Sequence, residues 1–184
     1  TNLNGDADHW YTIRGSDAGH VRILATGNNN MIETRNSSFW RLENFEMDGN
    51  NYLGSDGIHT SLTSDYYNDY THDLIMDGIE LHHFNNVPIS TKITTWNMTV
   101  RNCYVHDTYV GLYMGNSDGY APIINFTFEH NLVEKCTNYN MQIKAQLERV
   151  GVALGTTPGH TFTSWGWLVK DNVFMRDNAT ATAN

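Results

Sequence analysis

The chain has 184 residues, of which 40% are hydrophobic and only 17% are charged, and its formal net charge is -9 with an isoelectric point near 5.3. The small charged fraction argues against a disordered chain or a coiled coil, and the acidic surplus argues against a nucleic-acid partner. No stretch is long and apolar enough to predict a membrane span. The length suits one domain, and the many Asn, Asp, Gly, Ser and Thr residues favour an all-β chain with frequent corners over residues 1–184.

A strand–corner–strand pattern recurs along the chain, with two alternating apolar residues before a polar corner and a second short strand after it. Its copies begin at Tyr11, Trp40, Leu74, Met98, Phe126 and Trp167, and the first copy is the weakest. The intervals between copies are uneven. This argues against a propeller or a leucine-rich array, and it favours a parallel β-solenoid in which a constant unit is joined by loops of variable length.

A third strand is predicted after each of the first five copies, at 31–34, 57–60, 88–91, 111–114 and 140–143. Successive layers of such strands stack about 4.8 Å apart. Period-2 alternation sends Met98, Val100, Leu112 and Met114 toward the core. Asn131 and Asn172 recur at the corner position that Cys103 occupies, which predicts a ladder of small polar side chains there.

The repeats "VRNCYV" and "VKDNVF", together with the "G-I/L-x" strands, resemble the right-handed parallel β-helix superfamily of pectate-lyase-like proteins over residues 10–176. The resemblance implies an all-β right-handed parallel β-helix with three-strand coils and about six turns. It also implies a secreted protein that acts on polysaccharides. This superfamily includes lyases, hydrolases, epimerases, tailspikes and non-catalytic proteins. The activity of any one member must therefore be argued from the residues of its site.

In lyases of this superfamily the substrate usually lies across the strand that follows the long loop, which corresponds to the third strand here. The first outward column on that strand is Glu33, His59, Ser90, Tyr113 and Gln142, and the second is Arg35, Ser61, Lys92, Gly115 and Lys144. The chain has only four lysines and seven arginines, yet three of these cations fall in the second column. Such a row suits a polymer that carries one carboxylate per sugar.

β-Elimination of a uronate requires a base for the C5 proton and a cation that neutralises the carboxylate. Lys144, in "NYNMQIKAQ", resembles the lysine that one pectate-lyase family carries at the equivalent strand end, and we expect it to be the base. The expected catalytic set is Lys144, Arg149 and His59, and the expected substrate-binding set is Arg35, Lys92, Tyr113, Gln142, Gln146, Tyr66 and Tyr67. The alternative for the lysines is a solvated charge that protects an exposed strand from aggregation.

Tyrosines of the loop "TSDYYNDYTH" are expected to flank the proposed groove. Tyr66 and Tyr67 would stack on sugar rings there, although packing of the loop on the neighbouring layer explains them equally well. Hydrolysis ranks below elimination, because the exposed columns contain no acid except Glu33.

No metal site is predicted. His82 and His83 lack a third ligand at the spacing of a zinc site, and we interpret them as structural. Ca²⁺ is the cofactor that the superfamily would suggest, through Asn116 and Asp118 in "GNSDGY", but an Asx turn explains these residues as well.

The sequence therefore predicts a secreted, polysaccharide-active β-helix that cleaves an acidic, uronate-containing glycan by β-elimination. The alternative is a non-catalytic β-helix that serves as a surface, adhesion or carbohydrate-binding module. Neither end of the repeat array shows a cap, so we expect the domain to be part of a longer chain or to contact another chain end to end.

Overall fold

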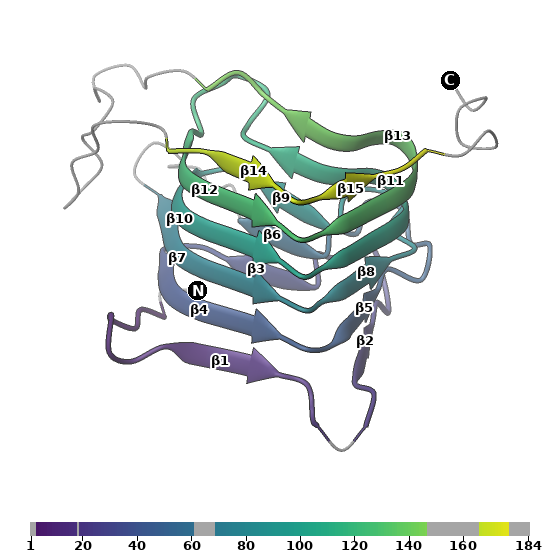
Figure 1. The fold of residues 1–184 in the computed structure, drawn as a ribbon, viewed down its shortest axis with the longest axis horizontal. Helices are drawn as coiled ribbons and strands as arrows, with labels where there is room; N and C mark the ends of the chain where they lie inside the picture. The colour runs from purple at the N-terminus through teal and green to yellow at the C-terminus, as the bar shows by residue number, and fades with distance from the viewer. Residues whose placement is uncertain (1–2, 18, 61–68, 147–165, 177–184) are drawn as a thin grey trace.

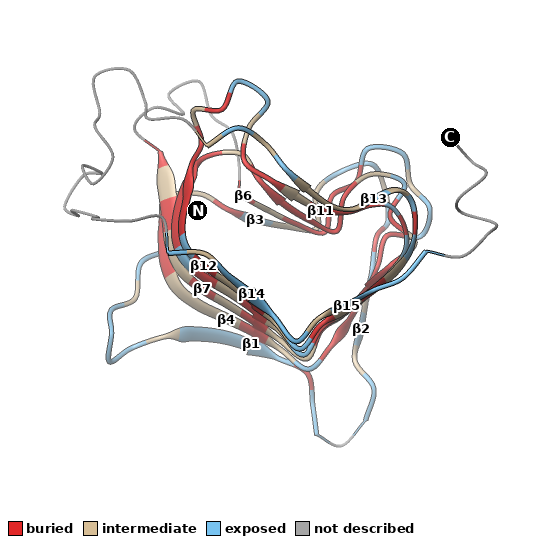
Figure 2. Cartoon of the chain, turned by 45° about the horizontal axis from the view of Figure 1, so that its top comes forward, coloured by how far each residue is buried: buried red, intermediate tan, exposed pale blue. Residues whose placement is uncertain are grey.

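The computed structural model describes residues 3–17, 19–60, 69–146 and 166–176. Within these ranges the chain forms fifteen strands, every ladder between named strands is parallel, and no helix is present (Figure 1). The same ranges therefore contain no helix that could cross a membrane. The chain is all-β, as predicted, and its strands stack in successive layers that curl around one core (Figure 2).

The first ladder contains one strand from each of the six layers. Its strands, in spatial order, are β1 (Tyr11–Arg14), β4 (Ser37–Glu43), β7 (Tyr70–Asp77), β10 (Thr94–Arg101), β12 (Ile123–Glu129) and β14 (Leu168–Lys170). Trp40 pairs with both Tyr11 and Leu74, and Met98 pairs with both Leu74 and Phe126. These partners are the first residues of the predicted copies, so the register inferred from the repeats is confirmed.

The second and third ladders belong to one curled sheet. The second contains β2 (Arg22–Leu24), β5 (Glu46–Asp48), β8 (Glu80–His82), the first part of β11 (Tyr104–Met114), the first part of β13 (Leu132–Ile143) and β15 (Val173–Phe174). The third contains β3 (Ile32–Thr34), β6 (Ile58–Thr60), β9 (Ile89–Thr91) and the last parts of β11 and β13.

The upper layers differ from the predicted pattern, because one long strand replaces two short ones. β11 pairs with β8 through Tyr104–His106 and with β9 through Leu112 and Tyr113. Two left-handed residues, Asp107 (φ 50°) and Lys135 (φ 52°), bend β11 and β13 between the two ladders. A bend within a strand thus replaces the type of loop that separates β5 from β6 and β8 from β9.

Asparagines hold the corner between the first and second ladders, as predicted. Asn131 is buried, its Oδ1 accepts the backbone N–H of Cys103 at 2.9 Å, and its Nδ2 donates to Val100 O at 3.0 Å. The Asn172 Oδ1 in turn accepts the backbone N–H of Asn131 at 2.9 Å. The residue before each of these asparagines, or before Cys103, has a left-handed backbone: these are Asn102, His130 and Asp171.

A second polar ladder, which the sequence analysis did not predict, bends the first sheet. Its members, Asp73, Asn97 and Asn125, have φ of 53° or 54° and share one register position in β7, β10 and β12; in β4 this position is held by Phe39, with φ 60°. Asn97 Nδ2 donates to Asp73 Oδ1 and Asn125 Nδ2 donates to Asn97 Oδ1, both at 3.1 Å. Asn and Asp tolerate this conformation, so polar side chains interrupt strands that otherwise alternate regularly.

The core is formed by the inward residues of all three ladders. Met98, Val100, Leu112 and Met114 are buried, as predicted. The middle layers are the most deeply buried, whereas the strand residues of β1, β14 and β15 are exposed (Figure 2). Both cysteines are free and buried, and burial raises the pKa of Cys103 to about 12.

Candidate functional site

The outward face of the third ladder carries the first predicted column in register. Glu33 pairs with His59, His59 with Ser90, Ser90 with Tyr113, and Tyr113 with Gln142. The five side-chain positions therefore lie one above another across β3, β6, β9, β11 and β13. The alignment of this column, which was read from the repeats alone, is confirmed.

The second column begins where these strands end. Lys92 follows β9, and its backbone N–H donates to Thr60 Oγ1 at 2.8 Å. Lys144 follows β13, and its backbone N–H donates to Met114 O at 2.9 Å. Arg35 follows β3, which is separated from β9 by β6. The two lysines thus lie at the same edge in the layers on either side of β11, and Arg35 lies two layers below Lys92.

The two lysines converge on Tyr113. The Nζ of Lys92 lies 3.6 Å from the centre of the Tyr113 ring, and the Nζ of Lys144 lies 4.9 Å from it. Both distances are within the range of a cation–π contact. The Tyr113 hydroxyl is 2.7 Å from Ser117 Oγ. One phenol therefore organises two ammonium groups on an outward face of the protein, and we call these three residues the Lys–Tyr–Lys cluster.

Partial burial changes the acidity of the Lys–Tyr–Lys cluster. Desolvation lowers the pKa of Lys92, and the positive charge of Lys144 lowers it further, against the opposing effects of Tyr113 and Asp56. Desolvation alone would raise the pKa of Tyr113, but its hydrogen bond to Ser117 and the two nearby ammonium groups outweigh this and lower it. Lys92 thus loses its proton more readily than an ordinary lysine, and Tyr113 is a stronger acid than an ordinary tyrosine.

His59, expected as a second acid or base, is held by a buried carboxylate. Its Nδ1 lies 3.0 Å from Asp56 Oδ2, which also accepts the Ser90 hydroxyl at 2.7 Å. The other ring nitrogen, Nε2, is buried and has no hydrogen-bond partner among the described residues. The Asp56 carboxylate therefore orients both His59 and Ser90, which are neighbours in the outward column.

Gln146 braces the backbone with both ends of its amide. Its Oε1 accepts the N–H of Ile123 at 2.7 Å, and its Nε2 donates to Lys144 O at 2.9 Å. This fixes the segment that presents Lys144. Three other predicted site residues, Arg149, Tyr66 and Tyr67, lie outside the described residues.

Asn116 and Asp118 both accept nearby backbone N–H groups, and the bond of Asp118 is that of an Asx turn. Asn116 Oδ1 accepts the N–H of Ser117, and Asp118 Oδ1 accepts the N–H of Tyr120, both at 2.9 Å. The loop that carries Ser117 toward Tyr113 is therefore shaped by its own side chains.

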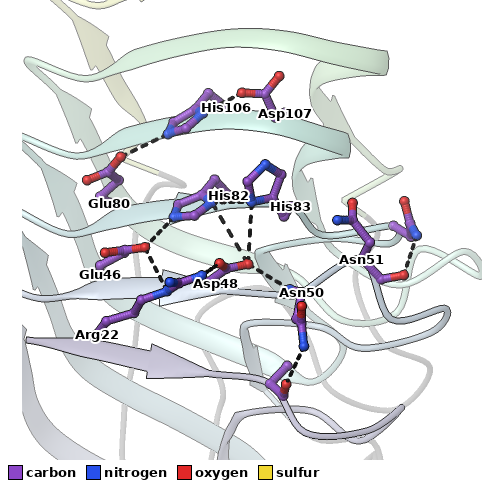
Figure 3. Close-up of polar contacts among 12 residues, drawn as sticks. Arg22, Glu46, Asp48, Asn50, Asn51, Glu80, His82, His83, His106 and Asp107 are labelled. Atoms are coloured by element: carbon purple, nitrogen blue, oxygen red, sulfur yellow. Dashed lines mark hydrogen bonds and ion pairs between the residues drawn. The ribbon is translucent and has the colours of Figure 1, made fainter.

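A second polar cluster lies on the outward face of the second ladder and was missed by the sequence analysis (Figure 3). Glu46 of β5 is its centre: its Oε1 lies 2.7 Å from His82 Nε2 and 3.0 Å from Arg22 Nε, and its Oε2 contacts His20. The ring of His82 stacks on that of His106, with 5.0 Å between their centres. Acidic and aromatic side chains from four successive layers therefore form one continuous network.

Asp48 extends this network to a second histidine. Its Oδ1 lies 3.4 Å from His83 Nδ1 and 3.9 Å from His82 Nδ1, while its Oδ2 pairs with Arg22. Among the described residues, Asp48, His82 and His83 form a group whose potential ligand atoms all lie within 4.8 Å of one another. The sequence contains a signal for this group, since Asp48 and His82 occupy the same register position in consecutive layers.

Burial and hydrogen bonding set the protonation of the second cluster. Desolvation would raise the pKa of Glu46, but hydrogen bonds from His20 and His82 outweigh it, and the pKa is lowered. Desolvation lowers the pKa of His82, and the neighbouring His83 and His106 lower it further, against the effect of Glu46. Near neutral pH this arrangement favours an ionised Glu46 beside a neutral His82 imidazole.

Comparison of the chain with protein-family models, with curated proteins and with solved structures found no match. The function is therefore inferred from the geometry of the two clusters.

Proposed function

We propose that the chain binds an acidic, uronate-containing glycan along the outward face of the third ladder and cleaves it by β-elimination. The observation that carries the proposal is the convergence of Lys92 and Lys144 on the ring of Tyr113. Two cations and a phenol within one site match the needs of this reaction, which are a carboxylate neutraliser, a base and an acid.

The proposal assigns the base to Lys92. The neutral amine of Lys92 takes the C5 proton, the C4–C5 double bond forms, and the C4–O4 bond breaks. Tyr113 donates its phenolic proton to the departing O4, and Lys144 pairs with the uronate carboxylate. The sequence analysis expected the base at Lys144, but the lowered pKa of the partly buried Lys92 favours an exchange of the two roles.

The outward column provides the remaining contacts with the sugar in this proposal. Gln142 lies beside Tyr113 in register and offers an amide to sugar hydroxyls. His59, which Asp56 orients, extends the binding surface toward β6. Arg35 is proposed as a cation for a more distant carboxylate. Contacts of Tyr66, Tyr67 and Arg149 with the sugar, which the sequence predicts, also belong to the proposal, although these residues lie outside the described ranges.

We infer a right-handed parallel β-helix of the pectate-lyase-like type, with three strand segments per coil. The parallel ladders in register and the asparagine corner support this inference. An extracellular glycan as substrate also implies a secreted protein.

Lys92→Arg tests the chemical step. Arginine keeps the positive charge but cannot act as a base near neutral pH. Pectate, alginate and glycosaminoglycans serve as substrates, and product formation is followed by the ultraviolet absorbance of the unsaturated uronate. The variant should form this product about 10²–10⁴-fold more slowly than the wild type and should still bind the glycan. Lys170→Arg, at an exposed lysine of β14 paired with Glu129, is the matched control and should leave the rate unchanged.

The second candidate function is a non-catalytic glycan-binding module. The cation–π arrangement of the Lys–Tyr–Lys cluster favours it as well, because such a surface binds acidic sugars without any proton transfer. Binding of an acidic glycan by the wild-type chain, with no unsaturated product from any substrate, would support the module and reject the lyase.

A further inference from the structure

Two consecutive histidines point to the same side of the second ladder, which a regular strand does not allow. His82 is the last residue of β8 and His83 follows it, so their side chains would normally point to opposite faces. His83 instead adopts a left-handed backbone with φ 55°. This rotation brings the two Nδ1 atoms to 2.7 Å from each other, both facing Asp48 Oδ1 (Figure 3).

His82 uses the lone pair of its Nδ1 in the hydrogen bond that joins its ring to His83. Its Nε2 faces Glu46 Oε1, a carboxylate oxygen that also pairs with Arg22, so the ring proton is placed on Nε2. A carboxylate that orients a histidine in this way is the usual outer partner of a metal-bound imidazole. The lone pair of His82 Nδ1 thus points at His83 Nδ1, where a cation would stabilise both nitrogens.

Asp48 is fixed in the orientation that a ligand requires. Arg22 pairs with its Oδ2, and the backbone N–H of Asn50 donates to its Oδ1 at 2.7 Å. The Oδ1 keeps a second lone pair, which faces the two histidines. Because Asp48 is buried and His83 is 45% exposed, the group has one closed side and one side open to solvent.

We propose that Asp48, His82 and His83 bind a divalent transition-metal ion of the zinc type through Asp48 Oδ1 and the two Nδ1 atoms. Ligand atoms around tetrahedral Zn²⁺ lie about 3.3 Å apart, given metal–ligand distances near 2 Å. The separations of 3.4 and 3.9 Å from the aspartate approach this value, and the two nitrogens, now 2.7 Å apart, need to open slightly. Three protein ligands leave the fourth position to water on the solvent side.

The donor set also selects the class of metal. Two imidazole nitrogens and one carboxylate suit Zn²⁺ and its neighbours in the first transition row, whereas Ca²⁺ and Mg²⁺ prefer oxygen ligands throughout. This site lies on the second ladder, and the glycan site proposed above lies on the third. The metal site is therefore independent of the proposed lyase chemistry.

Calorimetric titration of the full chain, freed of metal by a chelator, with Zn²⁺ alone tests the proposal. The wild type should bind one equivalent, and His83→Asn should weaken this binding by at least about 100-fold. Asparagine removes the imidazole but tolerates the left-handed backbone. His130→Asn is the matched control, because His130 has φ 56° and a side chain that is 53% exposed, and it should bind Zn²⁺ as the wild type does.

Equal Zn²⁺ affinity in the wild type and His83→Asn would overturn the proposal, as would failure of the wild type to bind Zn²⁺ below millimolar concentration. In a titration with Ca²⁺ in place of Zn²⁺, the wild type and His83→Asn should show the same affinity. A readout without any substitution is anomalous X-ray diffraction from crystals of the wild type soaked in Zn²⁺. It should show a peak between the three side chains, and zinc peaks found only elsewhere would reject the site.

Discussion

The asparagine corner should make a large and measurable contribution to stability, and Asn131→Ala tests it. The substitution leaves the buried N–H of Cys103 without its acceptor, at a cost of about 1–3 kcal/mol. It also removes the hydrogen bond to Val100 O, which contributes about 0.5–1.5 kcal/mol. The free energy of unfolding should therefore fall by about 2–4 kcal/mol.

Urea denaturation followed by circular dichroism measures this loss. Asn172→Ala is the comparison, because Asn172 makes the same type of corner contact in the last layer but is only partly buried. Water can replace its hydrogen bonds, so the loss should be about 1 kcal/mol. If both variants lose the same free energy, or if Asn131→Ala loses less than about 0.5 kcal/mol, the corner is not the buried anchor described above.

Three further predictions follow from the buried groups. In metal-free buffer, acidification from about pH 7 to about pH 4 should lower the free energy of unfolding. The pKa values of Glu46 and His82 are both lowered in the fold, so protonation favours the unfolded chain. Glu46→Gln should flatten this pH profile, and an unchanged profile would contradict the reasoning. The two buried cysteines should react with a chromogenic thiol reagent only after unfolding, since burial raises both thiol pKa values, and rapid labelling of the native chain would refute this. Gly111→Ala should cost about 1–3 kcal/mol, because a Cβ would lie 2.3 Å from Asn140 O in the next layer, whereas Gly27→Ala meets no atom within 4 Å and should be nearly neutral in the same urea assay.

Much of the strand framework was predictable because its signals are local and repeated. Alternating apolar residues place Met98 and Val100 in the core, and each copy of the pattern fixes the register of the next. The outward column through His59 and Tyr113 followed directly from that register. The merging of short strands into β11 was not predictable, because a left-handed Asp107 replaces a loop that the sequence pattern suggests.

The group of Asp48, His82 and His83 was missed for a physical reason. A search for ligands at short spacing finds His82 and His83 but not Asp48, which belongs to the preceding layer and approaches only through strand pairing. The left-handed backbone of His83, which turns both rings to one side, is also invisible in the residue pattern. Reading the outward column of the second ladder, as was done for the third, would have paired Asp48 with His82.

We propose above that the Lys–Tyr–Lys cluster binds and cleaves an acidic glycan. The most direct test of this function is a crystal structure of Lys92→Arg with a bound uronate oligosaccharide. We predict a sugar carboxylate within hydrogen-bond distance of Lys144, with C5 facing the side chain at position 92 and O4 facing the Tyr113 hydroxyl. An oligosaccharide bound on another face, or bound here with C5 pointing away from position 92, would contradict the proposed function.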